Sequence, residues 1–106
     1  MPASQIGASA KASLFQAVAR QLRPHWRPVD GADREKLVSK IRFRLNPDGT
    51  LAGAPSLVGQ RGETEANRAQ APRHAENAIR AVQLAAPFDL PPEYYEAWKT
   101  VTVDFD

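Results

Sequence analysis

Residues 37–49 read LVSKIRFRLNPDG, and the fold depends on this stretch. Apolar and polar side chains alternate from Leu37 to Leu45, so we predict a β-strand with one apolar face. Asn46 to Gly49 then predict a turn, because Pro presets φ and Gly tolerates positive φ. The other face of the strand carries three basic residues, Lys40, Arg42 and Arg44.

Two further strands are predicted. One covers about residues 50–58 and returns antiparallel after the turn, with residues 59–62 as a loop. Gly53 and Pro55 weaken this strand and favour an edge position. At the end of the sequence, residues 100–106 read TVTVDFD and predict a third strand, one face of which carries Val101, Val103 and Phe105.

Three segments show the spacing of helices. Residues 11–23 carry an apolar stripe made of Leu14, Phe15, Val18 and Leu22. The main helix is predicted over about residues 72–84, and a short helix over about residues 91–98. Trp26, which follows the first helix between two prolines, is predicted to fold back onto the core.

The order of these elements predicts an α+β fold. A three-stranded antiparallel sheet in the order 2-1-3 would pack the N-terminal helix and the main helix on one face. Residues 10–106 are expected to form this domain, and residues 1–9 a linker or stub. On the open face, we predict a cross-strand charge ladder that joins Lys40, Arg42 and Arg44 to the neighbouring Thr102, Asp104 and Asp106.

The charge of the chain is divided unevenly. Residues 1–44 hold nine Lys and Arg against three Asp and Glu, whereas residues 45–106 hold five against nine. The net charge is only +2, so we interpret the two halves as neutralising each other in the fold. The sequence has no Cys, no apolar run of the roughly 18 residues that span a membrane, and no signal peptide. This indicates either a cytosolic protein or a fragment of a longer one, and we favour the fragment.

No pattern in the sequence indicates catalysis, a metal site or a cofactor. His25 and His74 stand apart from other ligand-type residues; we expect His25 in a loop near the core and His74 in a solvated position on the main helix. No nucleophile motif or phosphate-binding loop occurs. The carboxylates at 93 and 96, and at 104 and 106, are expected to face solvent. We therefore predict a binding module that is not an enzyme and has no small-molecule substrate.

A small basic nucleic-acid-binding domain is an alternative from another class. RNA-binding sheets place aromatic side chains on their open face for base stacking. Here Phe43 and Phe105 are predicted on the helix-covered face, and Asp104 and Asp106 would repel phosphate. We therefore predict no nucleic acid as a partner and keep this class as a second alternative.

The strand over residues 100–106 is an open edge in the predicted sheet order. Such an edge can accept an extended peptide through main-chain hydrogen bonds. The other interpretation is an edge that Lys99, Asp104 and Asp106 protect from pairing. For Tyr94 and Trp98, packing in the core is likewise an alternative to binding. The predicted partner-binding residues are Thr100, Val101, Thr102, Val103, Asp104 and Phe105, with Tyr94, Tyr95 and Trp98 as aromatic anchors.

Two blocks of the sequence resemble a known family. They are IRFRLNPDGTLAGAPSLV at 41–58 and HAENAIRAVQLAAPFDLPPEYYEAWKTVTVDFD at 74–106. Together they resemble the C-terminal domain of TolA, in the variety found in alphaproteobacteria. The related TonB C-terminal domains share the hairpin. Residues 84–106, with Ala-Pro-Phe, Leu-Pro, Tyr-x-x-Trp-Lys and Asp-Phe-Asp, are the part that favours TolA.

The resemblance implies a periplasmic module at the end of a protein anchored in the inner membrane. It implies binding to the N-terminal segment of TolB, which would link inner-membrane motor proteins to the outer membrane in the Tol-Pal system during cell division. Colicins and filamentous-phage tip proteins use such domains in other bacteria and are further candidate partners. The alternative within the same class is a TonB-type energy transducer that contacts outer-membrane transporters.

Overall fold

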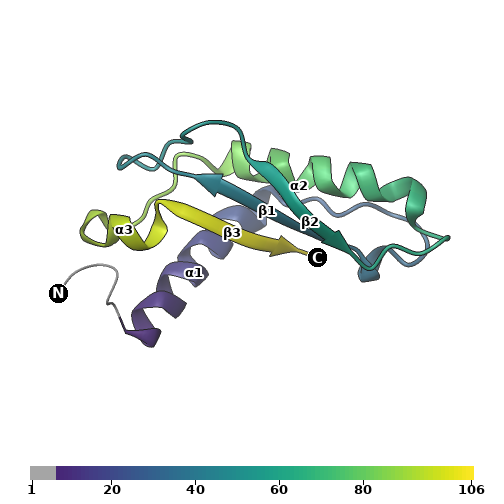
Figure 1. Ribbon diagram of the computed structural model, residues 1–106, viewed down its shortest axis with the longest axis horizontal. Coiled ribbons are helices and arrows are strands. Elements are labelled where there is room, and N and C mark those ends of the chain that lie inside the picture. Colours follow the sequence, from purple (N-terminus) through teal and green to yellow (C-terminus); the bar gives the residue numbers. More distant parts are fainter. Residues whose placement is uncertain (1–6) are drawn as a thin grey trace.

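The computed structural model describes residues 7–106, so most of the expected linker over residues 1–9 lies outside the described part. Two long helices lie on one side of a three-stranded antiparallel sheet in the order β2-β1-β3 (Figure 1). This confirms the predicted fold class and sheet order. The strands and helices are α1 (Ala8–Leu22), β1 (Val38–Arg44), β2 (Ser56–Arg61), α2 (Ala71–Ala85), α3 (Tyr95–Trp98) and β3 (Thr100–Phe105), joined by the 3₁₀ turns η2 (Arg23–His25), η3 (Arg34–Lys36), η4 (Arg68–Gln70) and η5 (Pro92–Tyr94).

The central strand β1 has the alternation that its sequence predicts. Ser39, Ile41 and Phe43 are buried, whereas Lys40, Arg42 and Arg44 are exposed. On one side β1 pairs with β3 in a regular register, in which Ile41 lies opposite Val103. On the other side it pairs with β2, with a bulge between Lys40 and Ile41.

The position of β2 differs from the prediction. After the turn, only an isolated bridge between Leu45 and Leu51 continues the pairing, and the strand begins at Ser56. Gly53, at φ 98°, and the buried Pro55 interrupt the chain between these two points. The predicted strand over 50–58 was therefore placed too early, and residues 59–61, predicted as a loop, belong to β2.

A single main core fills the space between the helices and the sheet. The small side chains of α2 let this helix approach β1 closely, and the rings of Phe43 and Phe88 stack at 5.4 Å between centroids. Phe15 was predicted on the apolar stripe of the first helix, but its side chain is 54% exposed. The buried members of the core are Val18, Leu22, Ile41, Phe43, Leu45, Ala78, Ala81, Val82, Phe88, Leu90, Trp98, Val103 and Phe105.

The predicted turn after β1 is present and is packed against the chain that follows α2. The Gly49 amide donates to the Asn46 carbonyl at 2.9 Å, and the Gly49 carbonyl accepts from the Phe88 amide at 2.8 Å. Asp48 accepts hydrogen bonds from the hydroxyl and the amide of Thr50, which lower the pKa of its carboxyl below the ordinary 3.8. The turn thus holds Phe88 in the core as well as reversing the chain.

Within residues 7–106, no helix is both long enough and apolar enough to cross a membrane.

Substituting Gly49 tests this packing role of the turn. Gly49 has φ 86°, and an added Cβ would lie 2.0 Å from the Phe88 carbonyl oxygen; Gly53 has φ 98° with nothing within 4 Å of an added Cβ. We expect Gly53→Ala to lower the free energy of unfolding by about 1 kcal/mol through left-handed strain alone. Gly49→Ala should lower it by a further ~1–3 kcal/mol through overpacking. Urea denaturation of both variants checks this, and equal losses would contradict the packing role.

Candidate partner-binding site

One edge of β3 presents its backbone to solvent. The Leu45 amide donates to the Lys99 carbonyl at 2.9 Å, which sets the phase of the antiparallel ladder between β1 and β3. Since hydrogen-bonded and non-hydrogen-bonded pairs alternate, Val101, Val103 and Phe105 turn their backbone groups toward β1. The backbone groups of Thr100, Thr102 and Asp104 therefore point outward. Within residues 7–106, no strand pairs with this side of β3, which we call the free edge.

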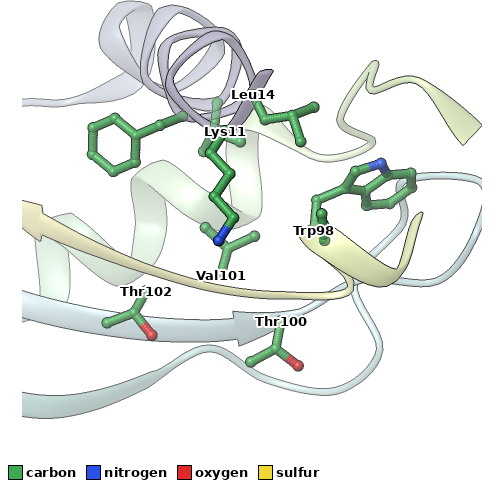
Figure 2. Close-up of a pocket in the computed structure, with 9 residues that line it drawn as sticks. Lys11, Leu14, Trp98, Thr100, Val101 and Thr102 are labelled. Atoms are coloured by element: carbon green, nitrogen blue, oxygen red, sulfur yellow. The ribbon is translucent and has the colours of Figure 1, made fainter. Parts of the chain in front are cut away.

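An apolar groove runs beside the free edge, between α1 and β3. The groove has a volume of about 380 Å³. Leu14 comes from α1, Trp98 from α3 and Val101 from β3, and the Lys11 side chain extends over the groove toward β3 (Figure 2). Phe15 and Val18 complete the helix wall. A smaller hollow of about 160 Å³, lined in part by Leu22, Trp26 and Val103, follows the same two elements toward the C-terminus. The groove could therefore receive alternate side chains of a strand laid along the free edge.

The predicted aromatic anchors pack in or against the core, in the segment that leads into β3. The Tyr95 hydroxyl donates to the Leu45 carbonyl at 2.7 Å, and its ring meets the edge of Trp98. Trp98 is only 2% exposed and donates from Nε1 to the Pro91 carbonyl at 2.8 Å. Tyr94 is half-buried against the core. Core packing, the alternative interpretation for Tyr94 and Trp98, describes their placement, although Trp98 also lines the groove.

The residues of β3 divide between the two faces of the sheet. Thr100, Thr102 and Asp104 are exposed on the open face, whereas Val103 and Phe105 are buried and Val101 is half-buried beside the groove. Val103 and Phe105 were predicted to contact a partner. Because both side chains are buried, a partner would mainly contact the outward backbone groups of Thr100, Thr102 and Asp104.

The predicted charge ladder forms only in part. Lys40 lies opposite Asp104 in the register, yet the ion pair of Asp104 is with Arg61 of β2, at 3.5 Å. Arg42 donates from Nε to the Thr102 hydroxyl at 3.3 Å. Only one carboxylate of β3 falls opposite a basic residue of β1, because Asp106 lies beyond the last paired residue. The open face next to the free edge therefore keeps more cations than anions.

The C-terminal end of β3 is held by Trp26, which folds back onto the core as predicted. Its Nε1 donates to the Asp106 carbonyl at 3.1 Å, and its ring packs on Phe105 at 5.1 Å between centroids. The same ring meets His74 in an edge-on arrangement, also at 5.1 Å. The C-terminal end of β3 thus packs on the ring of Trp26, which in turn packs on the ring of His74.

His74 is buried, at 1% exposure, and its predicted solvated position was wrong. Its Nδ1 lies 2.7 Å from the Ser39 hydroxyl, which accepts from Gln60 Nε2 at 3.0 Å. The other ring nitrogen of His74, Nε2, has no hydrogen-bond partner among the described residues. Burial lowers the pKa of His74, and the nearby Asp106 carboxylate opposes this in part. Sequence did hold a signal, since position 74 falls on the helical stripe of Ala71, Ala75 and Ala78.

Several other titratable residues line a second cleft. A cleft of about 550 Å³ lies between η2 and α2, lined by His25, Arg27, Glu76 and Arg80 among others. Within residues 7–106, no group of three or more His, Cys, Asp or Glu side chains is placed to hold a metal ion. The free edge and its apolar groove, which combine outward backbone groups with pockets for side chains, are the candidate functional site.

The chain was compared with known proteins, and a solved structure of a domain with a bound peptide is similar to it. No protein-family model and no curated protein matches the sequence. Among solved structures, the chain is similar to TolAIII in the solution NMR structure of TolAIII bound to a peptide derived from the N-terminus of TolB. The TM-score is 0.65 at 16% identity, over 95% of this chain and 77% of that chain. The two chains share a fold.

The burial of His74 predicts a pH dependence of stability. Its folded pKa lies below the ordinary 6.5, so folding favours the neutral ring. The stabilisation is complete above pH 6.5 and is lost as the pH falls through and below that value. We expect the free energy of unfolding, measured with urea between pH 8 and about pH 5, to fall on acidification. His74→Gln should flatten this dependence.

His25→Gln is the matched control, because His25 sits in η2 without a buried hydrogen-bond network. It should leave the pH dependence intact. Asp48 titrates in a more acidic range and does not interfere. Parallel pH profiles for the wild type and His74→Gln would contradict the role assigned to His74.

Proposed function

We propose that this chain is a protein–protein interaction module that captures an extended segment of TolB by strand addition at the free edge of β3. The observation that carries the proposal is the outward row of unpaired backbone groups at Thr100, Thr102 and Asp104, beside an apolar groove. Backbone hydrogen bonds to such an edge supply affinity, and pockets for alternate side chains supply specificity. The likeness to TolAIII, determined with a TolB peptide, supports TolB as the partner.

The same proposal includes a place in the cell envelope. A domain of this kind would act in the periplasm, as the C-terminal part of a protein anchored in the inner membrane. Capture of TolB would connect inner-membrane motor proteins with the outer membrane in the Tol-Pal system. The module would perform no catalysis, since its work is to hold a partner segment.

A titration followed by NMR tests strand capture. The ¹⁵N-labelled chain is titrated with a synthetic peptide that spans the N-terminus of mature TolB from the same genome. We expect chemical-shift changes to concentrate on residues 98–106 and on Leu14 and Phe15 of α1, which line the groove. Changes spread over the chain, or none, would overturn the proposal. Binding instead to an outer-membrane transporter peptide would favour a TonB-type role, and steeply salt-dependent binding to DNA or RNA a nucleic-acid role.

The groove can be tested separately from the edge with two exposed apolar residues. Phe15 on α1 is 54% exposed and lines the groove, whereas Leu84 on α2 is 57% exposed and lies outside it. Because both side chains are largely solvated, Phe15→Ala and Leu84→Ala should each change the free energy of unfolding by about 0.5 kcal/mol or less. Only Phe15→Ala should weaken peptide binding, by about fivefold. Equal affinities measured by calorimetry would exclude Phe15 from the contact.

A further inference from the structure

The side chain of Arg42 extends from the central strand toward the free edge. Its Nε donates to the Thr102 hydroxyl at 3.3 Å, which places the guanidinium above β3. Within residues 7–106, the two terminal nitrogens of Arg42 make no ion pair. Arg42 is thus a cation with unused donors, held in place beside the row of outward backbone groups.

Charge is distributed unevenly along this edge. Lys11 in the groove and Arg42 and Arg44 on the open face surround the stretch from Thr100 to Thr102. None of these three cations makes an ion pair within the described residues. Toward the C-terminus, Asp104 is paired with Arg61 and Asp106 follows it. A strand laid along β3 would therefore meet unpaired positive charge beside Thr100 to Thr102, whereas Asp104 is already paired with Arg61 and lies opposite Lys40.

We propose that Arg42 is a specificity-determining residue that selects an acidic side chain in the captured strand, at the position beside Thr102. The inference rests on the proposed function, since it requires a strand at the free edge. It defines the partner segment chemically: apolar side chains toward the groove and a carboxylate beside Thr102.

Strand geometry brings the two groups within reach. A strand added to β3 lies about 4.8 Å away, and the residue directly beside Thr102 projects from the same face. This holds for parallel and antiparallel addition alike, so the inference does not depend on strand direction. A carboxylate at this position meets the terminal guanidinium nitrogens, which form paired hydrogen bonds to carboxylates. The Thr102 contact fixes the guanidinium beforehand, so less side-chain freedom is lost on binding.

The test uses the TolB N-terminal peptide in three versions. Cross-strand NOEs first identify the peptide residue beside Thr102, and this residue is then made Glu, Gln or Lys. We expect each step from Glu to Gln to Lys to weaken binding by about two- to fivefold, as for an exposed ion pair. The difference between Glu and Gln should shrink as salt is added. Arg42→Gln should remove that difference.

Arg80→Gln is the matched control, because it removes the same charge from the exposed face of α2 and lies outside the groove. It should leave the preference for Glu unchanged. Equal affinities of the three peptides, with shifts still on residues 100–104, would overturn the selection by Arg42 and leave strand capture standing. If no version shifts β3, strand capture fails, and the selection fails with it.

Discussion

The structure depends on the burial of one face of β1. Ile41 and Phe43 are almost fully enclosed, and β1 is hydrogen-bonded to β2 on one side and to β3 on the other. Since the side chains of a strand alternate, a slip of one residue would bury the basic face and expose the apolar one. The core therefore fixes the register of β3, and that register decides which backbone groups face outward. The candidate binding edge is a consequence of core packing.

This dependence explains which parts of the structure were predictable. The strands β1 and β3 and the helix α2 follow from local periodicity and were predicted within a few residues. The sheet order, predicted from the succession of the elements, was also correct. The start of β2 was not, because alternation does not say where a chain interrupted by Gly53 and Pro55 resumes pairing. The burial of His74 was missed although its position lies on the apolar stripe of α2, because its hydrogen-bond partner Ser39 is far away in the sequence. Of the candidate site, the exposed residues of β3 were identified from the sequence. The groove was not, because predicting it requires knowing where α1 packs relative to β3.

The two edges of the sheet differ in what they offer a partner. The β2 edge exposes Leu57 and Val58, but a bulge interrupts its pairing there, which bends and twists a strand. The β3 edge has a regular register throughout, with Thr and Asp on its open face. A regular edge is a template for strand addition, and charge beside it discourages unselective pairing. The β3 edge is thus accessible to a matching strand, while its charges discourage unselective pairing. These two properties favour β3 over β2 as the proposed binding edge.

Both ends of β3 are fixed to other elements before any partner arrives. At its start, Leu45 bonds to the Lys99 carbonyl and to the Tyr95 hydroxyl; at its end, Trp26 holds Asp106. Binding at this edge, as proposed, would order the incoming segment and demand little ordering of the module, which would lower the entropic cost of association. Backbone bonds alone would accept almost any extended segment. Discrimination must come from side chains beside the edge, and the groove on one face and Arg42 on the other are placed to supply it.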